Sequence, residues 1–97
     1  MIVSFGDRAT EDLYHARPTP RARRLPNDIA GLVLVKLDML DSAAALLDLA
    51  SPPGNRLEAL KGDLKGSYSI RVNDQWRIVF RWKHNNAHDV RLTDYHS

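Results

Sequence analysis

The spacing of apolar residues changes once along this chain of 97 residues, from a helical period to a strand period. Between residues 29 and 47, apolar residues recur at steps of three and four, which is typical of one face of a helix. From residue 67 onward, apolar and polar residues alternate, which is typical of strands with one buried face. Helices followed by strands indicate an α+β fold, a single domain over residues 1–97 with its helices packed on one face of a small, mainly antiparallel sheet.

The long helix is expected to begin at Asn27 or Asp28, to break near residues 41–42 and to end at the proline-rich segment 51–55. Its apolar stripe, which is expected to lie in the core, consists of Ile29, Val33, Leu37, Leu40, Ala44 and Leu47. Upstream of it, we expect a short strand over residues 2–5 and a helix over residues 7–15 whose first residue, Asp7, caps it.

Residues 17–26 are expected to form a loop, because three prolines remove hydrogen-bond donors and restrict their neighbours. This loop carries several arginines, among them Arg21, Arg23 and Arg24. Such a run is either a solvated connector or an arm that binds nucleic acid.

Three strands are predicted over residues 67–72, 76–83 and 90–95, with turns over 73–75 and about 84–87. A three-residue first turn sets Arg71 opposite Arg77, whereas a two-residue turn would mix the apolar and polar faces. In the second hairpin, a pairing that keeps the faces separate sets Arg81 beside Arg91 and Arg77 beside Tyr95.

The polar face of this sheet would therefore carry four arginines. Because like charges that face each other across strands are destabilising, such a face is suited to binding an anion. In the alternative, the arginines lie flat on the sheet and pair with Asp63, Asp74 or Asp89.

Composition excludes several classes of protein. Without cysteine, the chain can have neither disulfides nor a thiolate zinc site. No apolar run approaches the ~20 residues of a membrane span, and the first residues are too quickly polar for a signal peptide. The net charge is +2, and the basic surplus lies in the second half of the chain. These features predict a cytoplasmic protein with a slight preference for anionic partners.

Three segments resemble a known family: Pro53–Asp63, Tyr68–Ile78 and the closing Asp94–His96. Their order and spacing are similar to the HigB branch of the RelE/ParE toxin superfamily, over nearly all of residues 29–96. The resemblance implies a RelE-like fold and a ribosome-dependent endoribonuclease that cleaves mRNA. It also implies a hetero-oligomeric complex with a HigA-like antitoxin.

The resemblance also implies a site. Lys61 and Arg77 match basic positions of the family's active site, and Asp94, Tyr95 and His96 match its C-terminal trio. At the position of Glu58, some family members have histidine and others glutamate, so its role is open.

The implied chemistry is attack of a ribose 2′-hydroxyl on the adjacent phosphorus, which needs neither metal nor cofactor. His96 suits proton transfer at neutral pH, and Asp94 or Glu58 is its counterpart or orients it. Lys61 and Arg77 would neutralise the charge that develops on the phosphate, and Tyr95 would stack on a base or position the hydroxyl. Further phosphate contacts are expected from Arg56, Arg71, Arg81 and Arg91.

Two other functions remain open for the same fold. One is a gyrase inhibitor of the ParE type, and the other is an inactive binding partner of the antitoxin. In the ribonuclease hypothesis, the basic segment from Arg21 to Arg24 would contact ribosomal RNA.

Overall fold

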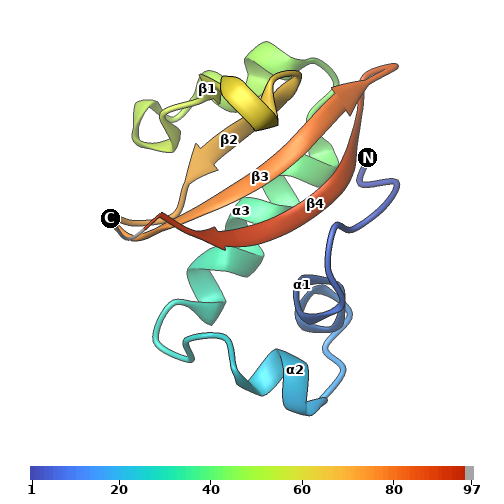
Figure 1. Cartoon of the computed structure of the whole chain (residues 1–97), viewed down its shortest axis with the longest axis vertical. Helices are drawn as coiled ribbons and strands as arrows, with labels where there is room; N and C mark the ends of the chain where they lie inside the picture. The colour runs from blue at the N-terminus through green and yellow to red at the C-terminus, as the bar shows by residue number, and fades with distance from the viewer. Residues whose placement is uncertain (96–97) are drawn as a thin grey trace.

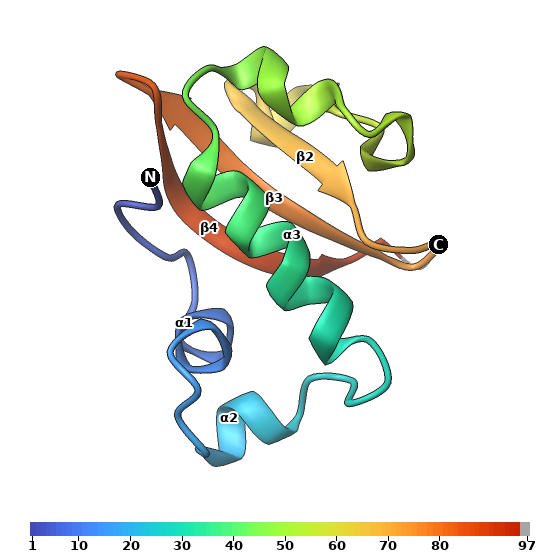
Figure 2. The same cartoon turned by 180° about the vertical axis from the view of Figure 1, so that it is seen from behind.

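The computed structural model describes residues 1–95, in which helices precede a four-stranded sheet (Figure 1). Its elements are α1 (Arg8–Tyr14), α2 (Pro20–Arg23), α3 (Ala30–Ser42), the 3-10 helices η1 (Leu46–Ala50), η2 (Pro53–Asn55) and η3 (Gly62–Leu64), and the strands β1 (Glu58–Ala59), β2 (Ser67–Arg71), β3 (Trp76–Lys83) and β4 (Asn86–Asp94). The strands follow chain order and every pair is antiparallel. Helix α3 lies across one face of the sheet, as predicted (Figure 2).

The N-terminal segment runs beside β4. Ile2 and Phe5 form isolated parallel bridges with Ala87 and Val90. Helix α1 then begins where Asp7 caps it, accepting a 2.8 Å hydrogen bond from the backbone N–H of Thr10. The helix and its cap are confirmed, whereas the predicted strand over residues 2–5 is reduced to the two isolated bridges.

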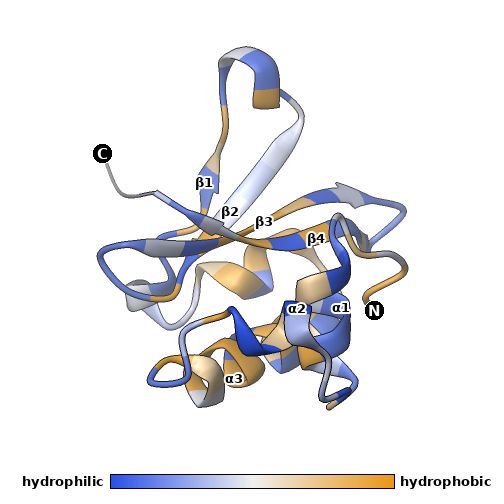
Figure 3. Cartoon of the chain, turned by 60° about the horizontal axis from the view of Figure 1, so that its bottom comes forward, coloured by the Kyte–Doolittle hydropathy of each residue, from blue (hydrophilic) through white to orange (hydrophobic). Residues whose placement is uncertain are grey.

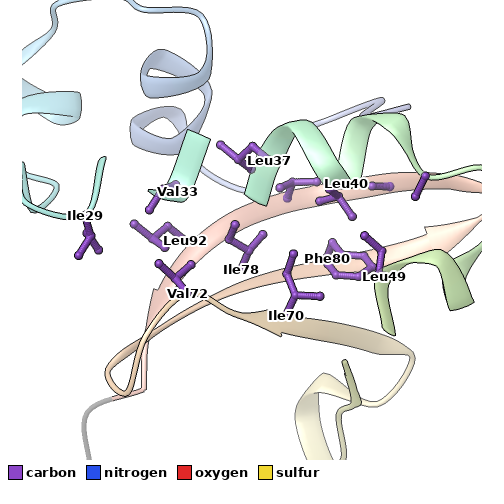
Figure 4. Close-up of a cluster of buried hydrophobic side chains, with 13 residues drawn as sticks. Ile29, Val33, Leu37, Leu40, Leu49, Ile70, Val72, Ile78, Phe80 and Leu92 are labelled. Atoms are coloured by element: carbon purple, nitrogen blue, oxygen red, sulfur yellow. The ribbon is translucent and has the colours of Figure 1, made fainter. Parts of the chain in front are cut away.

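The core lies between α3 and the sheet (Figure 4). The first four members of the predicted stripe are buried, facing the apolar sides of β2, β3 and β4. The prediction is wrong for Ala44 and for Leu47, which is 79% exposed, because α3 ends at Ser42 and its period stops there. Leu49 of η1 is buried instead.

Within the described part of the chain, no helix is long and apolar enough to cross a bilayer.

The predicted loop over residues 17–26 contains one turn of helix, α2, so that prediction is wrong in part. Pro20 occupies the first helical position, where its missing N–H would have had no partner inside the helix. Thr19 caps the turn by accepting a 3.2 Å hydrogen bond from the N–H of Ala22. Helix α3 starts at Ala30, slightly later than expected.

The first hairpin has the predicted pairing, with Arg71 opposite Arg77. The second hairpin does not, because its turn consists of two residues, His84 and Asn85, both with positive φ. A bulge at Asp89 (φ 54°) then shifts the pairing along the rest of the hairpin. The sheet also has a fourth strand, β1, which was not predicted.

Candidate active site

Arg77 projects from β3 on the face opposite α3, yet it is only 8% exposed. Its Nε–H donates to Ser69 Oγ at 2.8 Å, and its Nη2 donates to the carbonyl oxygen of Arg56 at 2.6 Å. Arg77 therefore lies on the predicted face and opposite Arg71, but it is buried. Its guanidinium is held by β2 and by the turn before β1.

The carbonyl that holds Arg77 belongs to a residue in an unusual conformation. Arg56 has a φ of 44°, in the left-handed region, and directly follows the fully buried Asn55. The amide of Asn55 donates to the carbonyl oxygens of Leu49 (3.2 Å) and Ser51 (3.4 Å), and its oxygen accepts from Lys36 Nζ. This buried amide therefore ties the turn to α3 and η1.

Lys36 is a buried cation in the middle of α3, and it was missed by the sequence analysis. Burial lowers the pKa of its ammonium group, and the positive charge of nearby Arg71 lowers this pKa further. Its place one turn before Leu40, on the buried side of the predicted stripe, was a signal that could have identified it. Ser69 and Asn55 had no comparable signal.

Two predicted site residues lie close to Arg77. Glu58 Oε1, on the edge strand β1, lies 4.0 Å from Arg77 Nη2. The ring centroid of Tyr95 lies 5.9 Å from the guanidinium carbon, close enough for a cation–π contact. Arg77 and Tyr95 are thus neighbours as predicted, although the residue directly opposite Arg77 on β4 is Thr93.

The end of β4 is fastened to the turn between β2 and β3. The backbone N–H of Tyr95 donates to the carbonyl oxygen of Gln75 at 2.6 Å, and Asp94 Oδ2 accepts from Gln75 Nε2 at 3.2 Å. These bonds place Asp94 and Tyr95 at the end of the sheet nearest Arg77. His96, predicted to transfer protons, lies outside the described residues.

Lys61 is exposed and lies at the N-terminal end of η3, two residues after the end of β1. Its carbonyl oxygen accepts from the N–H of Leu64 at 3.3 Å, but its side chain forms no hydrogen bond or ion pair with another residue between 1 and 95. The β1–β2 hairpin that carries it projects from the side of the sheet opposite the helices (Figure 3). Its predicted role at the phosphate remains a prediction.

The other predicted phosphate-binding arginines differ in their surroundings. Arg71 forms an ion pair with Asp74, which is one of the pairings that the sequence analysis left open. Arg81 faces His88, and Arg91 faces Val79, so the predicted Arg81–Arg91 pair is wrong because of the bulge. The exposed Arg56 serves the site through its carbonyl oxygen.

The arginines of the N-terminal half also separate into two kinds. Arg21 donates to the buried carboxylate of Asp12 at 3.0 and 3.2 Å, beside Thr19 and Arg17. The hydrogen bond from Thr19 lowers the pKa of Asp12, and those from the two arginines lower it further, against an opposing effect of burial. Arg21 and Arg23 are both exposed, but only Arg21 of the two has a carboxylate partner within residues 1–95.

At this end of the sheet, the structure therefore combines an anchored cation, a carboxylate and a phenol. A guanidinium has five N–H donors, and within residues 1–95 those on Nη1 of Arg77 donate to no other residue. They are suited to the nonbridging oxygens of a phosphate. Among the described residues, no three histidine, cysteine, aspartate or glutamate side chains gather closely enough to hold a metal ion.

The chain is similar to known proteins over nearly its whole length. The family described as the RelE-like toxin of type II toxin–antitoxin system HigB matches residues 3–96. Toxin HigB-1 of Vibrio cholerae is 45% identical over 82 residues, covering 84% of each chain. Endoribonuclease HigB of Proteus vulgaris is 30% identical over 102 residues, covering 99% of this chain and 100% of the relative.

Solved structures support the fold. A chain of a YoeB–YefM complex from Staphylococcus aureus superposes with a TM-score of 0.61 at 18% identity, covering 100% of this chain and 99% of that one. The YoeB dimer from the same organism gives a TM-score of 0.61 at 23% identity, covering 100% and 98%. Taken with the family match over residues 3–96, the chain belongs to the HigB-like family of RelE-like toxins of type II toxin–antitoxin systems.

Proposed function

We propose that this chain is a toxin that cleaves mRNA on the ribosome and is neutralised in the cytoplasm by a HigA-like antitoxin, with which it forms a hetero-oligomer. The observation that carries the proposal is the convergence of Glu58 and Tyr95 on an anchored Arg77. The name of the Proteus vulgaris relative, Endoribonuclease HigB, supports the same activity.

The reaction needs no nucleophile from the protein. The 2′-oxygen of a ribose attacks the adjacent phosphorus, the bond from phosphorus to the 5′-oxygen breaks, and a 2′,3′-cyclic phosphate and a 5′-hydroxyl result. One group must take the 2′ proton and another must protonate the leaving oxygen. His96, Asp94 and Glu58 are the candidates for these two roles.

Arg77 would stabilise the charge that develops on the nonbridging oxygens. Because Nε and Nη2 are held by the protein, the guanidinium is oriented before substrate arrives, and no free energy is spent on orienting it during the reaction. Lys61 would add a second charge from the β1–β2 hairpin. Tyr95 would stack on a base next to the scissile phosphate.

The ribosome would order the mRNA, which a sheet of this size holds poorly. Arg23 and Arg24 of the helical side are exposed and would contact ribosomal RNA. Arg21 is a weaker candidate for this contact because Asp12 already binds it.

Primer extension on mRNA with and without translating ribosomes tests the proposal, with His96→Ala and Arg77→Ala as loss-of-function variants. His84→Asn is the matched control, since it removes an exposed histidine at a turn whose left-handed backbone asparagine also adopts. We expect ribosome-dependent cuts by the wild type and the control, and none by the other two.

Binding of the antitoxin is measured on the same variants to verify that they fold. Cuts by the His96→Ala variant at the wild-type rate would refute the role of His96. A wild-type protein that binds antitoxin but cuts nothing under either condition would favour an inactive partner, and inhibition of gyrase would then identify a ParE-like toxin.

A further inference from the structure

A second group of polar side chains lies on the Arg77 face of the sheet, at the opposite end of the β3–β4 hairpin. A hollow of about 120 Å³ is lined there by Arg81, Lys83, His88 and Asp89. Arg81 and His88 face each other across the two strands. Lys83 lies two residues beyond Arg81 on β3 and therefore points to the same side.

His88 contributes a nitrogen atom without a partner. Its Nε2 is buried and makes no hydrogen bond within residues 1–95. Burying an unsatisfied polar atom is costly, so native proteins usually give such an atom a partner. A ligand that can bond with this nitrogen would remove that cost.

The charges around the hollow favour an anion. Arg81 and Lys83 are exposed, and neither forms an ion pair within the described part of the chain. The negative charge of Asp89 opposes these two positive charges, but other contacts explain the position of its backbone. Its N–H donates to Ser4 Oγ at 2.9 Å, and its carbonyl oxygen lies where a Cβ on Gly6 would be only 2.7 Å away.

We propose that this hollow is a second phosphate subsite, which binds a phosphodiester of RNA through Arg81, Lys83 and His88. Arg77 and Arg81 lie four residues apart on one strand and on one face, so their Cα atoms are about 13 Å apart along it. Arg91, opposite Val79, lies between them on that face. The inference rests on the proposed function only in taking RNA as the ligand.

The two ends of the hairpin would then hold one RNA strand at separate phosphates. Cleavage occurs at Arg77, and the second subsite fixes the direction in which the strand leaves. A short oligonucleotide that reaches only one end would bind more weakly than a longer one that reaches both.

The test measures binding of a single-stranded RNA decamer whose 2′-hydroxyls are methylated, so that cleavage cannot occur. The variant is the double substitution Arg81→Gln, Lys83→Gln. Its control is Arg8→Gln, Lys65→Gln, which removes the same charge from two exposed residues outside the hollow. We expect the first variant to weaken binding on the order of tenfold at 0.1 M salt, and to reduce the salt slope by about 0.7 for each lost contact.

Asp89→Asn should change affinity in the opposite direction, because it removes the one acid of the hollow. Asparagine adopts the left-handed region about as readily as aspartate, so the bulge is preserved. We expect binding to tighten severalfold. Weaker binding by Asp89→Asn would mean that the hollow takes a cation or a base instead, and would overturn the proposal.

The same variants are then measured on purified ribosomes. Weaker binding in this arm alone would assign the phosphodiester to ribosomal RNA rather than to the substrate strand. If the Arg81, Lys83 variant matches its control in both arms, the subsite does not exist. Because the decamer cannot be cut, this result does not depend on whether the protein cleaves RNA.

Discussion

The hydroxyl of Ser69 connects the stability of the sheet to the position of Arg77. Substitution Ser69→Ala removes the acceptor for Arg77 Nε–H and leaves that donor buried without a partner. A hydrogen bond from a charged donor contributes about 1.5–3 kcal/mol to the free energy of unfolding. We expect Ser69→Ala to lower the free energy of unfolding by this amount.

Ser67→Ala is the matched control. Ser67 lies on the same strand and face, two residues earlier, and is also buried, but its hydroxyl bonds to no residue between 1 and 95. We expect it to change the free energy of unfolding by about 0.5 kcal/mol or less. The difference between the two variants therefore measures the bond to Arg77 and not the loss of a buried hydroxyl in general.

The rate of RNA cleavage should also fall in Ser69→Ala and not in Ser67→Ala. In Ser69→Ala, Arg77 is still held through Nη2 by the carbonyl oxygen of Arg56, so it is loosened and not lost. A misplacement of about 1 Å can cost about 100-fold in rate, and we expect a loss of about 10- to 100-fold.

Urea denaturation followed by tryptophan fluorescence measures the stability of both variants, and single-turnover cleavage on ribosomes measures the rate. The reasoning is refuted if Ser69→Ala and Ser67→Ala agree in both measurements. A loss of stability without a loss of rate would show that the bond holds the sheet but does not position Arg77 for cleavage.

Four further predictions concern buried and charged groups. Asn55→Ala leaves the ammonium of Lys36 without an acceptor, and should lower the free energy of unfolding by about 2–4 kcal/mol in chemical denaturation. The pKa of Lys36 is lowered in the folded state, so the unfolded state binds its proton more tightly. Stability should therefore rise as pH increases from the folded pKa towards 10.5, and Lys36→Met should flatten this rise in melting curves. The pKa of Asp12 is lowered from 3.8, so its contribution to stability is present above pH 3.8 and is lost below it; acid titration of Asp12→Asn should lack this loss. Glu58→Gln removes the carboxylate nearest Arg77, and should tighten RNA binding while slowing cleavage in single-turnover assays; faster cleavage would exclude Glu58 as the base.

The faces of the strands could be predicted from the sequence, but the second pairing could not. Alternation assigns each residue of β3, and those of β4 from Val90 onward, to a face. The bulge at Asp89 breaks the alternation, so Ala87 and Val90 both lie in the core although they are three residues apart, and it also shifts the partners. The bulge depends on positive φ at Asp89, and the turn depends on positive φ at His84 and Asn85. None of the three is glycine, so the sequence carries only a weak signal for this conformation.

The burial of Arg77 could not be predicted from the alternation of polar and apolar residues either. An arginine that alternates with apolar residues is expected to face water, as Arg81 does. Arg77 is covered because its neighbours on β2 include the small Ser69, and because the turn at Arg56 closes over it. A small residue beside an arginine on the polar face of a sheet therefore indicates that the arginine can be buried there.

The hydrogen bonds of Arg77 to Ser69 and Arg56 use only one side of its guanidinium. Nε and Nη2 of Arg77 bond to the protein, and Nη1 is left for a ligand, which requires the planar fork of arginine. A lysine could bond to Ser69 or to a phosphate, but its single nitrogen could not hold both positions with fixed geometry. The cost of burying the cation is offset by two carbonyl oxygens, one hydroxyl and the distant carboxylate of Glu58. Since that carboxylate lies 4.0 Å away and is itself exposed, it neutralises Arg77 only in part, and the remaining positive charge is available to an incoming phosphate.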